Sequence, residues 1–387
     1  MQGVHSKHSR PMGSTIRPAG PWLRWSGGPL PSHIAKDGAG ALTFGQKFWR
    51  LLLTASAVSP LNLLAAAAPD PSLVTSIFSP ESTPAYSIMH LADFVLLITV
   101  VVFVFVFCLI VYAVAHFRRR SNDDGTEPPQ VYGSNPIEMA WTIVPILIVG
   151  VLALVTARVI HEIQDHPKPS TALDVQVIGH QFWWEIRYPT LGIVAANEIH
   201  VPVSRPDRPS PTFLDLRSAD VAHSFWVPRL AGKTEVIPNK KNTMWIEPNR
   251  TGLFLGQCAE FCGTQHALML IRVYVDTPEQ FDLWVQQQKT VAAVDSAHSH
   301  GRRVFEQNAC INCHALNGTE GTGRFGPDLT HLMSRATLAA GAMDNTSANL
   351  RAWVLDPNHF KPGVLMPAMN LNSQDLDSLV GYLLTLK

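Results

Sequence analysis

Soft metal-binding side chains gather in one short stretch of the sequence. Cys258 and Cys262 are followed by His266 and Met269, and His223 precedes them. Two thiolates, two imidazoles and one thioether form a donor set that suits copper better than Mg²⁺ or Ca²⁺, which prefer oxygen ligands. These residue types at this spacing therefore predict a soft transition-metal site.

Copper and zinc are the two metals to compare, because two cysteines and two histidines also form an ordinary zinc shell. Met269 favours copper, since a thioether is a poor ligand for zinc. A mononuclear blue-copper site uses one cysteine, so two cysteines predict thiolates that bridge two copper ions. Each ion would take one histidine and one weak axial donor, which is Met269 or a backbone carbonyl near Glu260. The alternative is a disulfide, which leaves both histidines and the methionine without a role.

A second chemical motif, Cys-Ile-Asn-Cys-His, lies at residues 310–314. The spacing is typical of haem c attachment, because two thiols add to the porphyrin vinyl groups and the next residue reaches the iron. Cys310 and Cys313 would hold the haem, and His314 would be its proximal ligand. A zinc or redox Cys-x-x-Cys is the alternative. The fifth cysteine, Cys108, lies in an apolar run and is expected to be a packing residue.

The chain from about Ser299 to its end resembles class I cytochromes c. The segments that carry the resemblance are Phe325–Leu329, Lys361–Pro367 and a closing amphipathic helix near Ser373–Leu386. It implies that Pro327 packs on the histidine side of the haem and that Met366 is the sixth ligand, with Met369 as the alternative. Ligation by His and Met raises the reduction potential. This domain is therefore expected to carry electrons and to do no substrate chemistry.

The copper donors lie in a stretch that is expected to fold as a β domain. From Thr171 to about Val275, short alternating runs are separated by Pro and Gly, as in an all-β sandwich or barrel. Examples of such runs are Leu173–Ile178, Asn197–Val203 and Leu270–Val275. A helical pattern follows Thr277, and a small, polar stretch around Val291–His300 reads as a linker.

Two apolar runs precede the β domain. Phe94–Ala115 and Met139–Ala157 contain no charged residue, and each is long enough to cross the roughly 30 Å hydrocarbon core of a membrane. Arg118–Arg120 directly follow the first run and place the connecting loop on the cytoplasmic side. The C-terminal region is therefore expected outside. A buried core helix is the alternative, which two such runs close together disfavour.

The N-terminal region is expected to be a leader. Residues 1–45 are rich in Gly, Pro, Ser and Arg and show no hydrophobic period. Lys47 and Arg50 then precede the apolar stretch Leu51–Ala68, which ends in small residues as secretory signals do. An uncleaved third helix is the alternative.

Composition excludes several classes of protein. The 30 basic residues balance 30 acidic ones, which argues against a nucleic-acid binder held by phosphate contacts. Five cysteines are too few for a disulfide-rich scaffold. Charged residues make up 16%, below the typical ~25%, as expected where part of the chain lies in a membrane.

From about Ala85 to Val285 the chain resembles subunit II of haem-copper cytochrome c oxidases, which carries a binuclear CuA centre. Besides the metal loop, the matching motifs are Asn135–Thr142 at the start of the second helix and Gly179–Trp184 beside the copper. The resemblance implies a transmembrane hairpin and a cupredoxin-like domain. It assigns the CuA ligands to His223, Cys258, Glu260 (through its carbonyl), Cys262, His266 and Met269.

The resemblance also implies roles outside the copper site. The Glu260 side chain would bind a Mg or Mn ion shared with subunit I, and Glu138 would stand at the entrance of a proton pathway. The alternative for Glu138 is an ordinary carboxylate at a helix N-terminus. Phe182, Trp183 and Trp184 would be electron-transfer aromatics. Family members fed by a separate cytochrome c usually have Trp where this chain has Phe182, and the attached cytochrome domain offers a reason for that departure.

The expected fold class is a multidomain membrane protein with a two-helix transmembrane hairpin, an all-β cupredoxin-like domain and an all-α class I cytochrome c domain. The expected ranges are 1–68 for the leader and signal peptide, 85–160 for the hairpin, 171–287 for the cupredoxin-like domain, 288–299 for the linker and 300–387 for the cytochrome.

The function that this resemblance implies is that of subunit II of a bacterial, proton-pumping, caa-type cytochrome c oxidase. One covalent haem c would take electrons from cytochrome c or a quinol-oxidising complex, and CuA would pass them to a haem in subunit I, where O₂ is reduced to water. The chain alone would transfer electrons and contribute no catalytic residue.

The expected partners are subunit I, the other oxidase subunits and membrane lipid, with no nucleic acid. The expected location is the bacterial inner membrane, with both metal domains on the periplasmic side. The alternatives are the electron-input subunit of a nitric oxide reductase and a non-enzymatic copper-binding or redox-binding protein.

Overall fold

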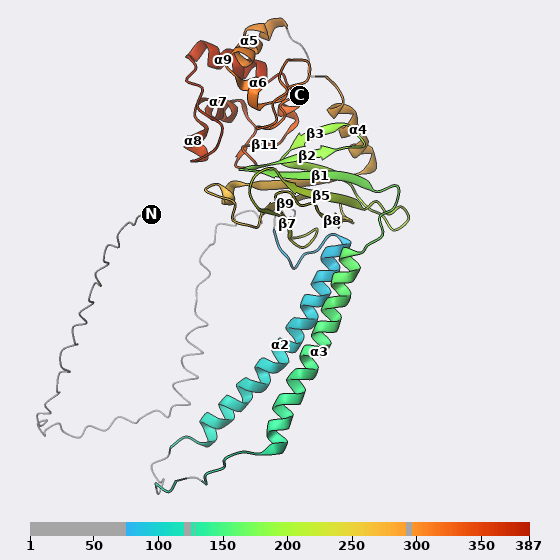
Figure 1. Cartoon of the computed structure of the whole chain (residues 1–387), viewed down its shortest axis with the longest axis vertical. Helices are drawn as coiled ribbons and strands as arrows, with labels where there is room; N and C mark the ends of the chain where they lie inside the picture. The colour runs from blue at the N-terminus through green and yellow to red at the C-terminus, as the bar shows by residue number, and fades with distance from the viewer. Residues whose placement is uncertain (1–74, 120–124, 128, 292–295) are drawn as a thin grey trace, which may run out of the picture. The chain divides into compact units, whose positions relative to one another are not determined.

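The computed structural model describes residues 75–119, 125–127, 129–291 and 296–387. The expected leader, residues 1–68, lies outside them. In Figure 1 the described chain forms two long helices, a β domain and a helical C-terminal domain. The fold class expected from the sequence is confirmed.

The two long helices are α2 (Thr83–His116) and α3 (Asn135–Gln164). Their most apolar windows have mean hydropathies of 3.5 and 2.6, and none of either window is buried by protein. Each begins with a proline in its first turn, where the missing N–H costs nothing. At 34 and 30 residues and ~1.5 Å per residue, both exceed the roughly 30 Å of a hydrocarbon core. The helices therefore extend beyond the two expected apolar runs on either side.

The first turn of α2 and the last turn of α3 are fixed to the β domain by hydrogen bonds. Ser82 Oγ accepts from the backbone N–H of Glu247 (2.9 Å), and Thr83 Oγ1 donates to the Glu247 carboxylate (2.6 Å). The indole Nε1 of Trp245 donates to the carbonyl of Ile163 (2.8 Å). Both long helices are thus hydrogen-bonded to residues 245–247 of the β domain.

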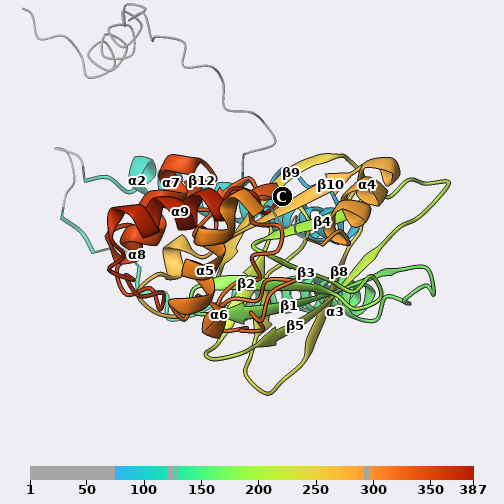
Figure 2. The same cartoon turned by 90° about the horizontal axis from the view of Figure 1, so that it is seen from above.

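The β domain consists of two five-stranded sheets that face each other (Figure 2). One sheet has the order β3-β2-β1-β5-β8, with strands Ile193–Ala196, Trp183–Tyr188, Leu173–His180, Thr212–Ser218 and Asn242–Ile246. The other has the order β4-β10-β9-β6-β7, with strands Glu198–Pro202, Leu270–Asp276, Gly252–Cys258, His223–Trp226 and Thr234–Val236. Side chains alternate between buried and part-exposed along β1 and β10, as in a sandwich with one core.

Strand pairing brings separate parts of the sequence together at one end of the second sheet. Strand β6 begins at His223 and pairs with β9, so that Phe225 lies opposite Cys258, the last residue of β9. The connection from β9 to β10 contains residues 259–269, including the short 3₁₀ helix η2 (His266–Leu268). The sheet therefore places the remote histidine beside the cysteine loop.

Helix α4 (Pro278–Gln288) follows the β domain and begins with a capping box. Thr277 Oγ1 accepts from the Gln280 N–H (3.2 Å), and the Gln280 side chain accepts from the Thr277 N–H (3.1 Å). The pattern satisfies two backbone donors that a helix start leaves unpaired.

The C-terminal domain has its own core. Its elements are η3 (Ser296–His298), α5 (Ser299–Gln307), α6 (Cys310–Cys313), η4 (Leu332–Ser334), β11 (Thr337–Leu338), β12 (Met343–Asp344), α7 (Ser347–Leu355), α8 (Pro357–Phe360) and α9 (Ser373–Leu383). Phe305 of α5 packs with Leu379 and Tyr382 of α9. A Cβ atom on Gly301 would lie 2.0 Å from the Ser378 carbonyl oxygen, so these two helices approach each other only where α5 has glycine.

Candidate copper and haem sites

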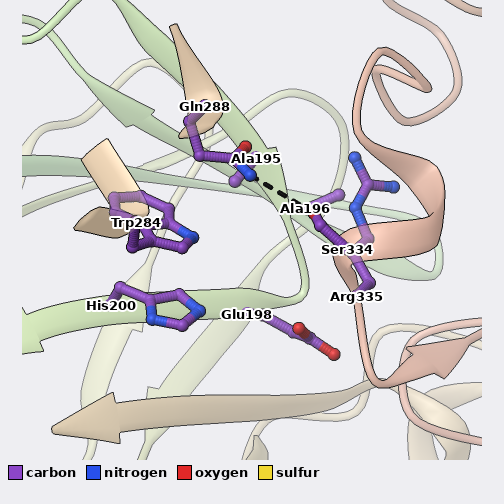
Figure 3. Close-up of a pocket in the computed structure, with 8 residues that line it drawn as sticks. All are labelled: Ala195, Ala196, Glu198, His200, Trp284, Gln288, Ser334 and Arg335. Carbon is purple, nitrogen blue, oxygen red and sulfur yellow. Dashed lines mark hydrogen bonds between the residues drawn. The ribbon is translucent and has the colours of Figure 1, made fainter. Parts of the chain in front are cut away.

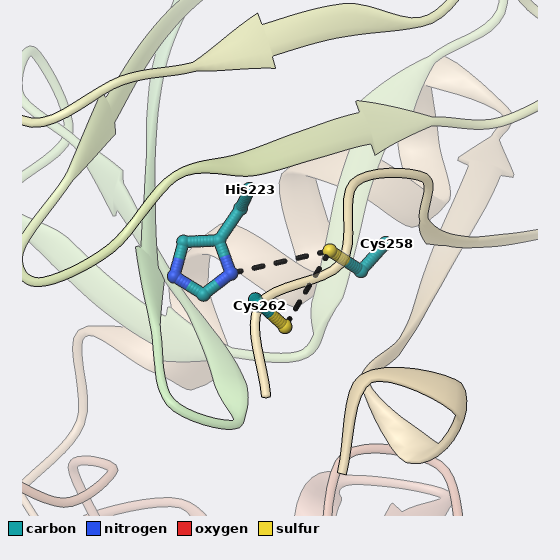
Figure 4. A group of neighbouring side chains, drawn as sticks. All are labelled: His223, Cys258 and Cys262. Atoms are coloured by element: carbon teal, nitrogen blue, oxygen red, sulfur yellow. Dashed lines mark hydrogen bonds between the residues drawn. The ribbon is translucent and has the colours of Figure 1, made fainter. Parts of the chain in front are cut away.

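His223, Cys258 and Cys262 point toward one another at the end of the second sheet (Figure 4). The two sulfurs are 3.9 Å apart, and His223 Nδ1 lies 3.9 Å from the Cys258 sulfur. All three side chains are buried. The sulfur–sulfur distance is far beyond the ~2.05 Å of a disulfide, so the structure does not form the disulfide considered above.

The other predicted copper ligands complete the cluster. His266 Nδ1 lies 3.8 Å from the Cys262 sulfur, and Met269 Sδ lies 3.9 Å from that sulfur. The Glu260 carbonyl oxygen lies 3.2 Å from the Cys258 sulfur. Each thiol thus has one imidazole nitrogen and one weak donor beside it. The structure brings together all six residues predicted as copper ligands.

These distances fit a metal centre. Donors on one ion, at metal–thiolate and metal–imidazole bonds of about 2.3 and 2.0 Å, lie about 3.5–4 Å apart. The spacings of 3.8–3.9 Å around the two sulfurs match that range. Two thiols that each neighbour a different histidine can bridge two ions, and the thioether suits copper. The donor set therefore fits a copper pair.

The two thiols interact strongly with each other. The hydrogen bond between their sulfurs lowers the pKa of Cys258 and raises the pKa of Cys262. Because metal ions bind thiolates, a metal held by these two sulfurs would displace the proton that they share.

Asp220 orients the remote histidine, a role that the sequence analysis did not assign. Its Oδ1 lies 2.8 Å from His223 Nε2, which leaves Nδ1 facing Cys258. Burial opposes the charged form of both groups, but their hydrogen bonding raises the pKa of His223 and lowers the pKa of Asp220. A carboxylate that holds the far nitrogen of a ligand histidine fixes the ring and increases its basicity. The sequence signal was an aspartate three residues before that histidine.

The expected motif Gly179–Trp184 contacts His223 and residues 258–269, the segment with the other predicted copper ligands, named here the copper loop. A Cβ atom on Gly179 would lie 2.7 Å from the His223 ring, so only glycine leaves room for this ligand. Gln181 Nε2 donates to the Cys262 carbonyl (2.7 Å). Phe182 and Trp184 are both buried in the core of the β domain. The motif supports the copper loop by packing and by hydrogen bonding.

The residues predicted to hold the haem lie on and just after α6. His314 follows Cys310 and Cys313, and its Nδ1 lies 2.7 Å from the Pro327 carbonyl oxygen. This bond leaves Nε2 free to face iron. Burial lowers the pKa of His314, which keeps the imidazole in the neutral form that binds metals. The arrangement fits a haem whose proximal ligand is held by Pro327.

Three further predicted residues have these positions in the structure. Met366 and Met369 lie in the irregular segment between α8 and α9, and both are half buried. Glu138 lies in the first turn of α3, and its carboxylate accepts from the Ser134 N–H (3.3 Å). That contact is the one expected of a helix N-terminal carboxylate.

A small pocket lies where the β domain and α4 meet the cytochrome domain (Figure 3). Its lining residues are Ala195, Ala196, Glu198, His200, Trp284, Gln288, Ser334 and Arg335. Trp284 stacks on His200 with ring centroids 4.5 Å apart, and Gln288 donates to the Ser334 hydroxyl (3.2 Å). The pocket lies at the contact between the β domain with α4 and the cytochrome domain.

Three family descriptions match successive parts of the chain. They are "Cytochrome C oxidase subunit II, transmembrane domain" over residues 71–159, "Cytochrome C oxidase subunit II, periplasmic domain" over 196–275, and "Cytochrome c" over 299–387. The matched regions correspond to the helical hairpin, most of the β domain and the C-terminal helical domain. The two C-terminal families imply copper and haem c.

Curated relatives match across all of these parts. The cytochrome c oxidase subunit 2 of Alkalihalophilus pseudofirmus is 36% identical over 316 residues, which cover 80% of this chain and 89% of that protein. The corresponding protein of Bacillus sp. (strain PS3) is 33% identical over 291 residues, covering 70% and 80%. That of Bacillus subtilis is 30% identical over 361 residues, covering 88% and 98%.

Proposed function

Because the chain belongs to the cytochrome c oxidase subunit II family, we propose that it is the electron-input subunit of a caa-type, proton-pumping oxidase. In this proposal electrons from cytochrome c or a quinol-oxidising complex reach the cytochrome domain first. They then pass to the β domain and on to subunit I, where O₂ is reduced to water. When bound, haem c and the copper pair supply the one-electron carriers.

The observation that carries this proposal is a hydrogen bond between the copper loop and the segment that contains Met366. Gln265, which lies within the copper loop beside His266, donates from Nε2 to the carbonyl of Pro362 (2.6 Å). Pro362 belongs to the segment that continues to Met366, the proposed axial ligand of the haem. One hydrogen bond thus joins the copper loop to the haem-ligating segment, which supports electron transfer within a single chain.

In this function the six clustered donors would hold a binuclear CuA centre. His223 and His266 would each serve one ion, the two thiolates would bridge, and Met269 and the Glu260 carbonyl would be the weak donors. Asp220 would keep His223 in its tautomer and orientation. The rigid β6–β9 pairing would hold this set still, which suits a group that changes charge without changing ligands.

In the cytochrome domain, Cys310 and Cys313 would attach one haem c, and His314 and Met366 would be its axial ligands, with Met369 as the alternative. Pro327 would fix the proximal imidazole through its carbonyl. Because both axial positions would be filled by protein, the iron would exchange electrons without binding a substrate.

The attached cytochrome would offer a different route for electrons to the one that a tryptophan at position 182 serves. The Phe182 carbonyl accepts from Lys361 of the cytochrome domain (3.1 Å), and Trp183 is buried with Ala196 and Ala340. A soluble donor would therefore meet the surface of the cytochrome domain and not the aromatic motif. We propose that input to copper runs through this chain's own haem, beside Phe182 and Trp183.

Two glutamates would connect the chain to subunit I. Glu260 is exposed beside Phe261, whose side chain is 76% exposed, and it would share a Mg or Mn ion with that subunit. Glu138 would stand at the entrance of a proton pathway on the opposite side of the membrane. The proposed location is the bacterial inner membrane, with the β and cytochrome domains on the periplasmic side and lipid around α2 and α3.

The test uses the oxidase complex purified with this chain. We expect covalent haem c in the chain and the many-line electron paramagnetic resonance signal of a mixed-valence copper pair. After flash reduction of haem c, its reoxidation should coincide with reduction of the copper pair.

Two variants serve as reciprocal controls for this test. C310A should remove covalent haem and leave the copper signal, while C262S should do the reverse. Zinc in place of copper, a mononuclear copper signal, or copper reduction at an unchanged rate in C310A would contradict the proposal.

A further inference from the structure

Lys361 is a buried cation at the contact between the cytochrome and β domains. Its side chain is 1% exposed, and Nζ donates to three carbonyl oxygens, those of Phe182 (3.1 Å), Leu268 (2.9 Å) and Ala339 (3.1 Å). An ammonium group has three donors, so this one is fully used. The first two acceptors belong to the β domain: Phe182 precedes β2, and Leu268 precedes the copper donor Met269.

Glu198 makes the opposite contact from the β domain. It is the first residue of β4 and is 5% exposed. Its carboxyl group accepts from the N–H groups of Ala336 (3.0 Å) and Thr337 (3.2 Å), and from the Thr337 hydroxyl (3.3 Å). In Figure 3 its side chain lies near the main chain of Arg335 of the cytochrome domain, whose guanidinium group points away from it. Each domain therefore contributes one buried ionisable side chain that forms hydrogen bonds with backbone atoms of the other domain.

Further contacts surround these two side chains without involving them. The Leu270 N–H donates to the Ala340 carbonyl (3.1 Å), which extends β10 by one bond into the cytochrome domain. A Cβ atom on Gly363, whose φ is +85°, would lie 2.8 Å from the Thr264 hydroxyl. The two domains thus meet closely near Lys361, through a backbone hydrogen bond at Leu270 and through the Thr264 side chain at Gly363.

We propose that Lys361 and Glu198 are positioning residues that hold the cytochrome domain against the copper loop in one orientation. Buried backbone carbonyls and N–H groups must be paired. If the cytochrome domain turned or slid while still packed on the β domain, these buried carbonyl and N–H groups would lose their partners without gaining water. The two contacts lie on different segments of each domain, so together they fix the rotation as well as the position of the cytochrome.

This inference rests on the proposed function, because its consequence is the rate of electron transfer. Lys361 is followed by Pro362, whose carbonyl accepts from Gln265 of the copper loop. Holding Lys361 in place therefore also holds residues 361–366 next to Gln265 of the copper loop. Segment 288–299 then acts as a covalent connection, and the orientation is set by the domain contact.

The test uses the intact oxidase complex with two substitutions, one in each domain. K361M keeps the aliphatic stem and removes all three donors. E198Q keeps an acceptor and removes the charge. K289M and E320Q change exposed residues of the same two types and serve as matched controls.

Two measurements are made on each variant. Hydrogen exchange of the Leu270 amide reports docking, because that amide bonds to Ala340 and contacts neither substituted side chain. Flash-induced electron transfer from haem c to copper reports the functional consequence. The haem and copper spectra and the exchange of α9 amides establish that both domains remain folded and loaded.

We expect Leu270 exchange to be at least tenfold faster and haem-to-copper transfer at least tenfold slower in K361M, with smaller changes in the same direction in E198Q. Both controls should stay within twofold of the wild type. Wild-type exchange and transfer in both variants, with intact spectra, would overturn the positioning role and leave the proposed function standing. Absence of haem-to-copper transfer in the wild type would instead overturn the proposed function. If K361M does not assemble, E198Q alone decides between these outcomes.

Discussion

In the β domain the proposed copper donors come from the start of β6, the end of β9 and the loop after it. Only strand pairing brings His223 within 3.9 Å of Cys258. In the cytochrome domain, by contrast, Cys310, Cys313 and His314 are neighbours in the chain, and α6 needs only one helical turn to present them. The copper site is therefore a property of the folded sheet, whereas most of the haem site is a property of local sequence. Substitutions around the copper should act through the fold, and substitutions around the haem should act on the ligand that is changed.

The largest effect is expected at Cys258, because its sulfur would bind both copper ions. C258S removes a thiolate that we propose to bridge the two copper ions, so neither ion would keep its ligand set, and we expect loss of both ions with haem c unchanged. Metal analysis and electron paramagnetic resonance of the purified complex measure the outcome. C108S changes a cysteine of α2 and should retain the full copper signal. Retention of both coppers in C258S would contradict the assignment.

The haem site should respond to a single ligand without any effect on copper. M366L removes the proposed thioether and should lower the haem reduction potential by on the order of 0.1–0.3 V, part of the about 0.8 V range that axial ligands set. Spectroelectrochemical titration of haem c measures the shift. M369L, three residues further along the same segment, should leave the potential unchanged. A shift in M369L and none in M366L would exchange the roles of the two methionines.

A change outside the ligand set should weaken the copper site through the fold. D220N leaves a weaker partner for His223 Nε2, and we expect copper affinity to fall by about 10–100-fold, as is typical when the partner of a ligand histidine is altered. Competition with a copper chelator measures the affinity. D215N removes a carboxylate that pairs with Lys241 in the same domain and should have no effect on affinity. Equal affinities in D220N and the wild type would show that the β6–β9 pairing alone orients the histidine.

The smallest effect is expected from a buried carboxylate further from the copper. Burial alone would raise the pKa of Glu185, but hydrogen bonds from His180 and Arg187 lower it below its ordinary value of 4.5. The stabilisation is therefore present above pH 4.5 and is lost as the pH falls through the lower pKa of the folded state. We expect E185Q to destabilise the β domain by about 1–3 kcal/mol at pH 7.

The measurement for E185Q is the temperature at which the copper absorption is lost, recorded between pH 3 and pH 7. The gap between E185Q and the wild type should close toward the acid end. Glu235, in the same domain, offers the matched control E235Q. A gap that is constant across the pH range would show that Glu185 does not act through its charge.

Prediction from sequence was most direct where the residues with chemistry lie close together in the chain. The cysteine loop and the Cys-x-x-Cys-His motif each identify their residues by type and spacing, and the hydrophobic alternation of β1 and β10 is visible in the sequence. The role of Asp220 could have been anticipated from its position three residues before His223. The bounds of α3 could not, because the helix continues into polar residues that no apolar run marks.

The contacts of Lys361 and Glu198 were beyond prediction for a different reason. Each residue is ordinary in its own segment, and its burial depends on where one domain rests on the other. No periodicity records such a contact, because the partners are backbone atoms, which every residue type supplies. The short hairpin β11–β12, which carries Thr337 and leads to Ala340, was not predicted because each of its strands has only two residues.

The burial of Trp183 beneath Ala340 also bears on how this protein can change its redox partner. A domain attached by a short connection occupies its binding surface at an effective concentration of roughly millimolar, so a freely diffusing competitor rarely finds the copper face vacant. Selection for a new donor would then act on the outer surface of the cytochrome domain, while the face around Trp183 is constrained only by its permanent neighbour. If the proposed electron path holds, recognition of the donor and delivery of electrons to copper could thus evolve separately.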